Sequence, residues 1–254
     1  MKNKTDTLYE LYKKYEKLDS WYVALGMQQI DDLEPSNYLL KLISDFEKNL
    51  IDEESLEKKL YNYYEMQRAK NKSVFREYEC DLVSSRMVKI IKDYKNFNFS
   101  EEYLKQIHKY LFKDVFVFAG TYRKTNLSKK EKILNGDTVK YSNYQDIEAY
   151  LNYDFNEYKS KEFSIENITD FLSNIWQIHP FNEGNTRTII IFMLHYLQSL
   201  GYDLNYEFFK NDSKAFRNSL VTSNYENLKE KIYPDKEPLK EYMKKLLNVK
   251  TKRL

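Results

Sequence analysis

The chain has 254 residues, of which 42% are hydrophobic, enough to fill the core of one large domain or of a core domain with a small appended one. Its 41 basic and 39 acidic residues leave a net charge of only +2, which gives no field for binding a polyanion, so we expect no direct contact with nucleic acid. The single cysteine, Cys80, excludes an internal disulfide and a cysteine-rich zinc site, and no apolar run is long enough to span a membrane, so we expect a globular, cytoplasmic protein.

The amino-terminal residues predict a small helical module. Five glycines and four prolines are few for this length, so long helices and an all-α fold are expected. Residues 5–31 carry apolar side chains at spacings of three and four, which is typical of one helix face. Pro35 ends this helix, Ser36 can cap a second one through Phe46, and a third runs from about residue 51 to 69.

We assign residues 1–70 to this three-helix module and residues 71–254 to a core domain, with the polar stretch 68–73 as the linker. The core domain also carries helical patterns, and Ser100 and Ser164 stand where N-caps belong. Its predicted helices are 78–94, 100–112, 164–178, 185–200, 213–223 and a last one opened by Pro238.

A short β-hairpin is the one β element that the sequence predicts. Asn135-Gly136 is a strong signal for a tight two-residue turn. Apolar residues lie on both sides of it, Ile133 and Leu134 before the turn and Val139 and Tyr141 after it. These flanks are expected to pair as two strands.

The stretch 179–188, His-Pro-Phe-Asn-Glu-Gly-Asn-Thr-Arg-Thr, concentrates polar and charged groups between two apolar helices. Residues 189–194 are apolar on all sides, so their helix must run through the core, and packing fixes its N-terminus. Unpaired backbone N–H groups and the helix dipole at that end favour an anion such as phosphate. The predicted anion-binding residues are Gly184, Asn185, Thr186 and Arg187.

Each side chain of this stretch suggests a chemical role. Gly184 leaves room for close approach of the anion, and Arg187 adds a forked positive charge. Glu183 is an oxygen ligand suited to Mg²⁺, which prefers one or two carboxylates together with phosphate oxygens. His179 precedes a proline and so leaves helical geometry, which presents its ring at the mouth of the anion site as a general base. Phe181 is expected to anchor the loop in the core.

The whole string resembles the signature of the Fic (Fic/Doc) family, His-Pro-Phe-x-Glu-Gly-Asn-x-Arg. Similar landmarks occur at 107–112, 118–123 and 213–218, so the resemblance covers about residues 75–250. It implies a Fic-type helical core with a small β-hairpin flap at residues 124–141, which aligns a segment of a target protein by backbone pairing.

Proteins of this family mostly transfer AMP from ATP to a hydroxyl side chain of a target protein. The resemblance therefore implies a nucleotidyltransferase that uses ATP and Mg²⁺ on a partner protein with a Ser, Thr or Tyr acceptor. His179 is then the catalytic base and Glu183 the metal-binding residue. The nucleotide-binding residues are Gly184, Asn185, Thr186 and Arg187. A homo-oligomer is left open, and so is export as a secreted effector.

The sequence departs from the family pattern at two positions. Many relatives have Gly after the Asn, where this chain has Thr186. Many also carry a second arginine that helps to orient the terminal phosphates, and its place is taken by Ile190. Either a flap lysine such as Lys124, Lys129 or Lys130 replaces that arginine, or ATP is held differently, so the transferred nucleotide is left open.

The segment from Asp31 to Ser36, followed by two helices, resembles the VbhA-type antitoxin domain. This domain obstructs the ATP site of bacterial Fic proteins and can be fused to them, joining toxin and antitoxin in one chain. In that family a Ser or Thr precedes an inhibitory Glu by four positions, and the corresponding residues here are Met27 and Asp31. Since Ile190 cannot pair with Asp31, steric obstruction is the expected restraint, and a module that only stabilises the core is the alternative.

Two other functions are left open. A degenerate Fic protein would bind nucleotide or a partner without catalysis, which Ile190 favours. A de-AMPylating enzyme would need a carboxylate to activate water, and Asp31 is the candidate. His108, His195 and Cys80 lie within helical patterns and are predicted to be buried structural residues.

Overall fold

The computed structural model describes residues 19–68 and 74–247, which contain ten α-helices, two 3₁₀ turns and no β-strand. This confirms the predicted all-α class. The helices are α2 (Asp19–Ile30), α3 (Asn37–Glu47), α4 (Glu53–Arg68), α5 (Phe75–Ile91), α6 (Glu101–Phe112), α7 (Ile147–Lys159), α8 (Ile165–Ile178), α9 (Asn185–Ser199), α10 (Phe209–Thr222) and α11 (Glu237–Leu246). Within the same ranges, no helix has the length and apolar character needed to cross a bilayer.

Three serines cap helices where the sequence predicts them. The hydroxyl oxygens of Ser36, Ser100 and Ser164 each accept a hydrogen bond, of 3.0 to 3.2 Å, from the backbone N–H three residues later. These bonds satisfy donors that have no partner within the helix, so each cap fixes where its helix begins. The early part of the first predicted helix, residues 5–18, lies outside the described residues.

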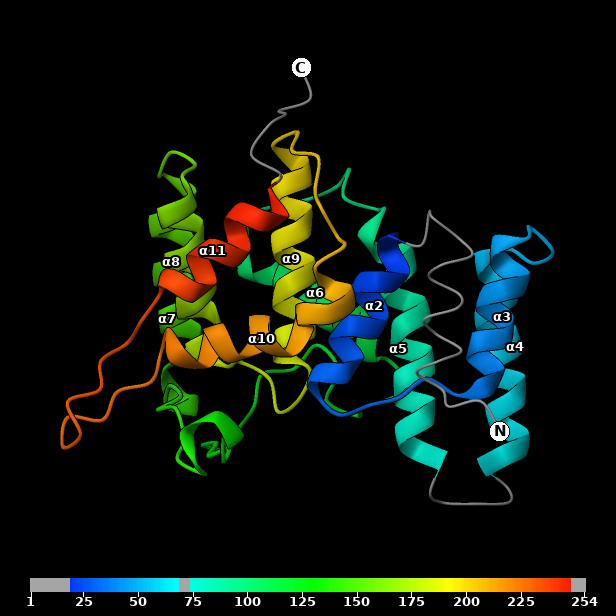
Figure 1. Ribbon diagram of the computed structural model, residues 1–254, viewed down its shortest axis with the longest axis horizontal. Helices are drawn as coiled ribbons and strands as arrows, with labels where there is room; N and C mark the ends of the chain where they lie inside the picture. Colours follow the sequence, from blue (N-terminus) through cyan, green and yellow to red (C-terminus); the bar gives the residue numbers. More distant parts are fainter. Residues whose placement is uncertain (1–18, 69–73, 248–254) are drawn as a thin grey trace.

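Helix α2 lies between α5 and α10, in the body of the molecule (Figure 1). It crosses α10 at Gly26, where a Cβ atom would lie 2.1 Å from the carbonyl oxygen of Phe209 and 2.3 Å from the hydroxyl oxygen of Ser213. Any larger residue at this position would therefore force the two helices apart. This close crossing brings the C-terminal end of α2 to the N-terminal end of α9.

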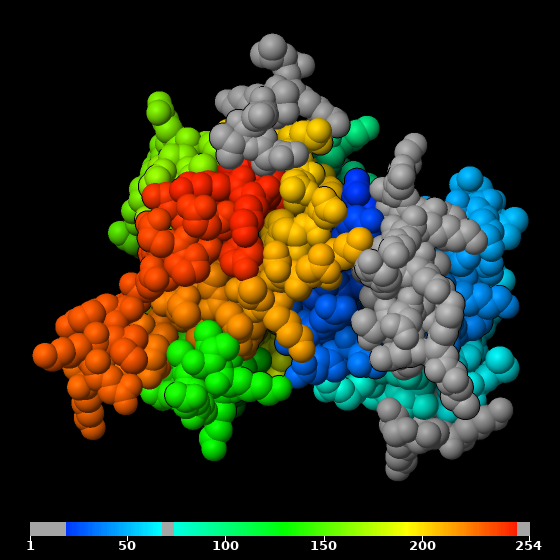
Figure 2. All heavy atoms as spheres, viewed as in Figure 1, coloured from blue at the N-terminus to red at the C-terminus, as the bar shows by residue number. Residues whose placement is uncertain are grey.

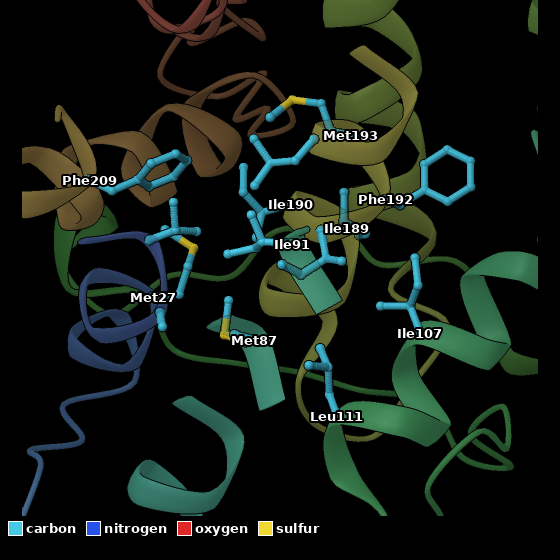
Figure 3. Close-up of a cluster of buried hydrophobic side chains, with 14 of the residues drawn as sticks. Met27, Met87, Ile91, Ile107, Leu111, Ile189, Ile190, Phe192, Met193 and Phe209 are labelled. Carbon is cyan, nitrogen blue, oxygen red and sulfur yellow. The ribbon is translucent and has the colours of Figure 1, made fainter. Parts of the chain in front are cut away.

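Helix α9 runs through the core, as its apolar sequence predicts. Residues 189–194 are all at most 3% exposed. Figure 3 shows Ile190 in a cluster with Met27 of α2, Met87 of α5 and Phe209 of α10. Side chains of the amino-terminal helices and of the core helices thus share one hydrophobic cluster, and the division at residue 70 stays a prediction.

Helices α3 and α4 lie at one end of the molecule, beyond α5 (Figure 1). Buried polar groups on α5 hold them. The Asp81 carboxylate accepts hydrogen bonds from the backbone N–H of Ser36 (2.9 Å), from its hydroxyl and from the Tyr64 hydroxyl (2.6 Å). Arg86, 1% exposed, forms an ion pair of 3.0 Å with Glu57 of α4. Because these bonds are buried, their loss would leave unpaired polar groups in the core.

The structure has the predicted turn at Asn135-Gly136, but the predicted strands on either side of it are wrong. Asn135 (φ 53°) and Gly136 (φ 92°) both adopt left-handed geometry, and the N–H of Glu131 donates to the carbonyl oxygen of Asp137 at 2.8 Å. However, Lys132–Leu134 forms a 3₁₀ turn, and this part of the chain has no ladder of strand hydrogen bonds. Side chains hold it instead, since the Tyr225 hydroxyl donates to the Asp137 carboxylate at 2.7 Å.

One helix, α7, was not predicted. Its buried residues Ile147, Leu151 and Phe155 recur every four positions, which is the helical spacing that could have identified it. The adjacent polar segment obscured this signal.

The Asp81 carboxyl makes stability depend on pH. Burial, outweighing the hydrogen bonds from Ser36 and Tyr64, raises its pKa to about 6, against about 3.9 in an unfolded chain. Its stabilising contribution is therefore complete below about pH 4 and is lost as the pH rises through 6, a change of about 2–3 kcal/mol. Denaturant unfolding at pH 4 to 7.5 measures the free energies of unfolding of wild type and Asp81→Asn. Wild type should lose about 2–3 kcal/mol relative to the variant as the pH rises over this range. Parallel pH profiles of the two proteins would contradict this expectation.

Candidate active site

The polar loop between α8 and α9 has left-handed residues at both ends. His179 caps α8 with φ 50° and ψ 60°, and Gly184 precedes α9 with φ 77°. His179 leaves helical geometry, as its place before Pro180 predicts, but through the left-handed region and not the extended one. The loop thus reverses direction within six residues.

Phe181 and Asn185 hold this loop in shape. Phe181 is fully buried, as predicted, with its ring stacked 3.8 Å from the His108 ring. The Asn185 side chain accepts from the Phe181 N–H at 2.9 Å and donates to the Phe181 carbonyl oxygen at 2.7 Å. The Asn185 amide is therefore used to fasten the loop, so only its backbone N–H is left for an anion.

The other two histidines and the cysteine are buried, as predicted. His108 Nδ1 accepts from the Gly120 N–H at 2.8 Å, so Nε2 carries the proton that is donated to the Glu183 carbonyl oxygen at 3.1 Å. His195 bonds the Ile90 carbonyl oxygen at 2.7 Å and the Tyr103 hydroxyl at 2.9 Å. His108 thus holds the loop in place through its bond to Glu183 and its stacking on Phe181.

His179 has the tautomer that a general base needs. Its Nδ1 lies 3.1 Å from the carbonyl oxygen of Trp176, which can only accept, so Nδ1 carries the proton and Nε2 is the basic nitrogen. The ring is 4% exposed and lies beneath Tyr141, with ring centroids 4.3 Å apart. The sequence predicts that the ring is presented at the mouth of the anion site, and in the described structure a side chain of the flap segment (residues 124–141) covers it.

Burial, reinforced by the charge of Lys129 and then of Arg123 and Arg217, holds the pKa of His179 well below its usual value. The ring is accordingly neutral at pH 7 and able to accept a proton. A protonated ring could not act as a base.

Packing explains two of the predicted anion-binding positions in a different way. A Cβ atom at Gly184 would lie 2.3 Å from the Phe112 ring, so glycine is required by that ring as well as by its positive φ. The Thr186 hydroxyl accepts a hydrogen bond of 3.0 Å from the indole N–H of Trp176. Close approach of an anion is thus not the only reason for these residues, and their binding roles stay predictions.

Arg187, predicted from the sequence to add a forked positive charge for phosphate, is buried and paired inside the protein. Its guanidinium donates to Glu79 of α5 and to the Gln28 side-chain oxygen of α2, both at 2.9 Å, and forms an ion pair of 3.1 Å with Asp31. It also lies 4.8 Å from the centre of the Phe112 ring. Neither Gln28 nor Glu79 was identified from the sequence, since each lies in an ordinary helical pattern.

The turn after α2 is held against the site by several cations. Arg76 donates to the carbonyl oxygens of Asp31 and Asp32 at 3.0 Å. Asp32 (φ 52°) forms ion pairs with Lys214 of α10 at 2.6 Å and with Lys132 at 3.4 Å. This fixes the Asp31 carboxylate, 42% exposed, beside Arg187.

Glu183 has the accessibility expected of a Mg²⁺ ligand. Its side chain is 53% exposed and forms an ion pair of 3.2 Å with Lys129 of the flap segment. The described residues hold no cluster of three metal-binding side chains, but Mg²⁺ bound beside phosphates needs only one or two carboxylates. Nearby, the Arg187 Nε is buried without a hydrogen-bond partner in the described structure, a donor that suits an anion. The residues present therefore fit Mg²⁺ together with phosphate.

Arg123 connects the flap segment to the loop. Its guanidinium is 2% exposed and donates to the carbonyl oxygens of His179 (2.8 Å), Ile178 (3.2 Å), Thr125 (2.7 Å) and Ser142. Four carbonyl partners leave it no part in binding a ligand, and its effect is to set the backbone at His179.

Arg217 of α10 is another arginine near the site that the sequence did not identify as a site residue. It makes a forked ion pair with Glu131 of the flap segment, with Nη2 to Oε1 at 2.7 Å, and Glu131 is only 3% exposed. The Tyr141 hydroxyl donates to the same carboxylate at 3.4 Å. In Figure 2 the green atoms of the flap segment lie against the orange atoms of α10 and the chain that follows it. Arg217 thus contacts the segment that covers His179.

Comparison with known proteins identifies a family domain in this chain, and the matched residues include the loop between α8 and α9. Residues 98–197 match the model of the Fic/DOC family. The chain is 28% identical over 118 residues to the protein adenylyltransferase VbhT of Bartonella schoenbuchensis, a match that covers 43% of this chain and 23% of the relative. It is 30% identical over 128 residues to a probable protein adenylyltransferase of Sinorhizobium fredii, covering 47% of this chain and 62% of the relative. The chain therefore spans less than two thirds of either relative.

Solved structures share the fold. A Fic domain-containing signaling protein from Bacteroides thetaiotaomicron superimposes with a TM-score of 0.52 at 18% identity, covering 96% of this chain and 92% of that chain. The N-terminal Fic domain of a putative cell filamentation protein from Bartonella quintana, with bound ADP, gives a TM-score of 0.53 at 18% identity, covering 70% of this chain and 86% of that chain. At such identities the likeness shows the fold alone.

We predict that His179 is neutral, with the proton on Nδ1, down to at least pH 6. Long-range ¹H–¹⁵N correlation spectra from pH 5.5 to 8 should show one protonated and one unprotonated ring nitrogen, without titration. A His179→Asn variant identifies its signals among only three histidines. Two protonated ring nitrogens at pH 6 would contradict this environment.

Proposed function

The chain carries a Fic/DOC family domain at residues 98–197, and we propose that it is a protein adenylyltransferase, which transfers AMP from ATP to a hydroxyl group of a target protein. One observation carries the proposal. A neutral histidine whose Nε2 is the basic nitrogen caps α8 and lies four residues before Glu183, in the loop that leads to the N-terminus of the buried helix α9, whose first turn holds Arg187. A base and an anion-binding helix end in one loop are what phosphoryl-group transfer to an alcohol requires.

The chemistry assigns one step to each group. His179 Nε2 accepts the proton of the target hydroxyl as its oxygen bonds to the α-phosphorus of ATP. The bond from that phosphorus to the bridging oxygen of the β-phosphate breaks, and pyrophosphate leaves with the electron pair. The backbone N–H groups at the start of α9 and the Arg187 guanidinium hold the phosphates in place. Positioning and charge neutralisation supply most of the rate gain.

Glu183 is the residue that would hold Mg²⁺ together with phosphate oxygens. When bound, the ion neutralises phosphate charge and orients the leaving group. Lys129, now paired with Glu183, would then be released toward the phosphates.

The relatives and neighbours support a nucleotide as substrate. Both curated relatives are adenylyltransferases by name, one of them a probable one, and the Bartonella quintana domain contains ADP. Whether this chain uses ATP, and on which protein, is part of the proposal, because the matched segments cover only part of each relative.

The flap segment offers a path for the target protein. In the described structure the backbone N–H groups of Val139 and Tyr141 make no hydrogen bond, and since alternate N–H groups of an extended chain face the same side, a target segment can pair with them. Tyr141 covers His179, and it must shift when a Ser, Thr or Tyr acceptor arrives. Binding of the target segment would thus uncover the His179 ring in the same step.

The turn after α2 restrains the site in this state. Asp31 and Gln28 both occupy Arg187, so the amino-terminal helices oppose phosphate binding by charge as well as by bulk. Because Ile190 is uncharged, Asp31 pairs with Arg187, and this ion pair is the restraint on phosphate binding. Nucleotide binding without catalysis is the second candidate function, which the buried, apolar Ile190 and the occupied Arg187 favour.

Replacing His179 with alanine should abolish transfer and preserve nucleotide binding. Labelling of the protein or of a lysate protein with α-labelled ATP is expected to fall by at least about 100-fold, the usual effect of losing a general base. The ATP dissociation constant should stay within about threefold of wild type. Full labelling by His179→Ala would refute the role of the base, and ATP binding without labelling by wild type would favour the second candidate.

Replacing Asp31 with asparagine should release Arg187. We expect at least about fivefold tighter ATP binding, equivalent to about 1 kcal/mol, which is the scale of one partly exposed ion pair. Glu54→Gln is the matched control, because it removes an exposed negative charge on α4. Titration calorimetry on the full chain measures both variants. Equal affinities of wild type and Asp31→Asn would show that Asp31 does not restrain the site.

A further inference from the structure

Helix α9 supplies a single cation to the anion site. Arg187 lies in its first turn, and the residue one turn later on the same face is Ile190, which is 1% exposed and packed beside Met27 and Phe209 (Figure 3). A nucleoside triphosphate carries several negative charges over a length greater than one guanidinium can reach. Other elements must therefore supply further positive charge.

Most of the other arginines in the described ranges have structural partners that account for them. Arg76 holds the turn after α2, Arg86 fastens α4, and Arg123 donates to four backbone carbonyl oxygens. Arg217 differs, because its partner belongs to the flap segment over the catalytic histidine. It is the arginine whose placement calls for a functional explanation.

The geometry of Arg217 leaves donors free. Its two terminal nitrogens bind the two oxygens of Glu131 in a fork, and a guanidinium bound in this way keeps its Nε–H and its outer N–H groups for another partner. The side chain is 22% exposed, so part of it is accessible to a ligand. Glu131 therefore orients Arg217 and need not release it when an anion binds.

Arg217 also lies on the side of α10 that faces the turn after α2. Lys214, three residues earlier, forms its ion pair with Asp32 at 2.6 Å, and the neighbouring Asp31 pairs with Arg187 at 3.1 Å. After Glu131, the negative charge of Asp31 also contributes to raising the pKa of the Arg217 guanidinium, so Asp31 lies close to Arg217. One carboxylate thus lies in the field of two arginines from different helices.

We propose that Arg217 is a second phosphate-binding residue, and that the terminal phosphates of a nucleoside triphosphate replace the Asp31 carboxylate between Arg187 and Arg217. The inference rests on the proposed function, since it concerns the same nucleotide site. Arg217 from α10 supplies the charge that α9 lacks at Ile190. Glu131 acts as a positioning residue, so closure of the flap segment and alignment of the phosphates are coupled.

Nucleotide binding tests this assignment. Titration calorimetry with ATP, ADP and AMP is carried out on the full chain with Mg²⁺, for wild type, Arg217→Gln, Arg217→Lys and Lys210→Gln. Arg217→Gln should weaken ATP binding by at least tenfold and AMP binding by less than twofold, and Arg217→Lys should lie between it and wild type. Lys210→Gln removes the same charge from the same helix, where Lys210 lies over the Tyr22 ring of α2, and it should change ATP binding by less than threefold.

Thermal unfolding by circular dichroism shows whether each variant is folded. Equal loss of ATP and AMP affinity in Arg217→Gln would mean that Arg217 only supports the fold, and unchanged ATP affinity would also overturn the assignment. A double-mutant comparison does not depend on the stability of one variant. The increase in ATP affinity caused by Asp31→Asn should be at least threefold smaller in the Arg217→Gln background than in wild type. An equal increase in both backgrounds would contradict the inference. If wild type and His179→Ala bind neither ATP nor AMP, the proposed function itself fails.

Discussion

The pairing of the buried Arg187 guanidinium is the interaction on which the rest of the structure depends. It joins the first turn of α9 to Glu79 of α5 and to Gln28 and Asp31 at the end of α2. A buried arginine with its partners removed would be an uncompensated charge in the core, so the three elements must stay together unless another anion takes over. A phosphate group can do so, because it offers the same forked acceptor geometry as a carboxylate.

Charge pairing at the site therefore connects structure with regulation. Arg187 is bound to Glu79 and Asp31, Arg217 to Glu131, and Lys129 to Glu183. These pairs stabilise the state described here, and the phosphates and Mg²⁺ would compete for the same groups. In the proposed function the amino-terminal turn contributes one of the competing carboxylates, and removal of that carboxylate is expected to raise nucleotide affinity.

The sequence predicted the helices and the loop better than the partners of the loop. Caps at Ser36, Ser100 and Ser164 and the apolar run of α9 depend on local chemistry, and all were found as expected. Local patterns do not reveal which distant side chain neutralises an arginine. Glu79, Gln28 and Arg217 come from three helices that meet only in the folded chain, and the cover that Tyr141 gives His179 depends on the path of the flap segment. The predicted strands failed for the same reason, because side-chain bonds to α10 and to the chain after it hold the segment.

Phosphate and the Asp31 carboxylate are proposed to compete for Arg187. A crystal structure of the full chain with Mg²⁺ and a nonhydrolysable ATP analogue tests this competition most directly. We expect phosphate oxygens within hydrogen-bond distance of Arg187 at the N-terminus of α9, with Asp31 displaced. A bound nucleotide elsewhere, with the Asp31–Arg187 pair intact, would contradict it.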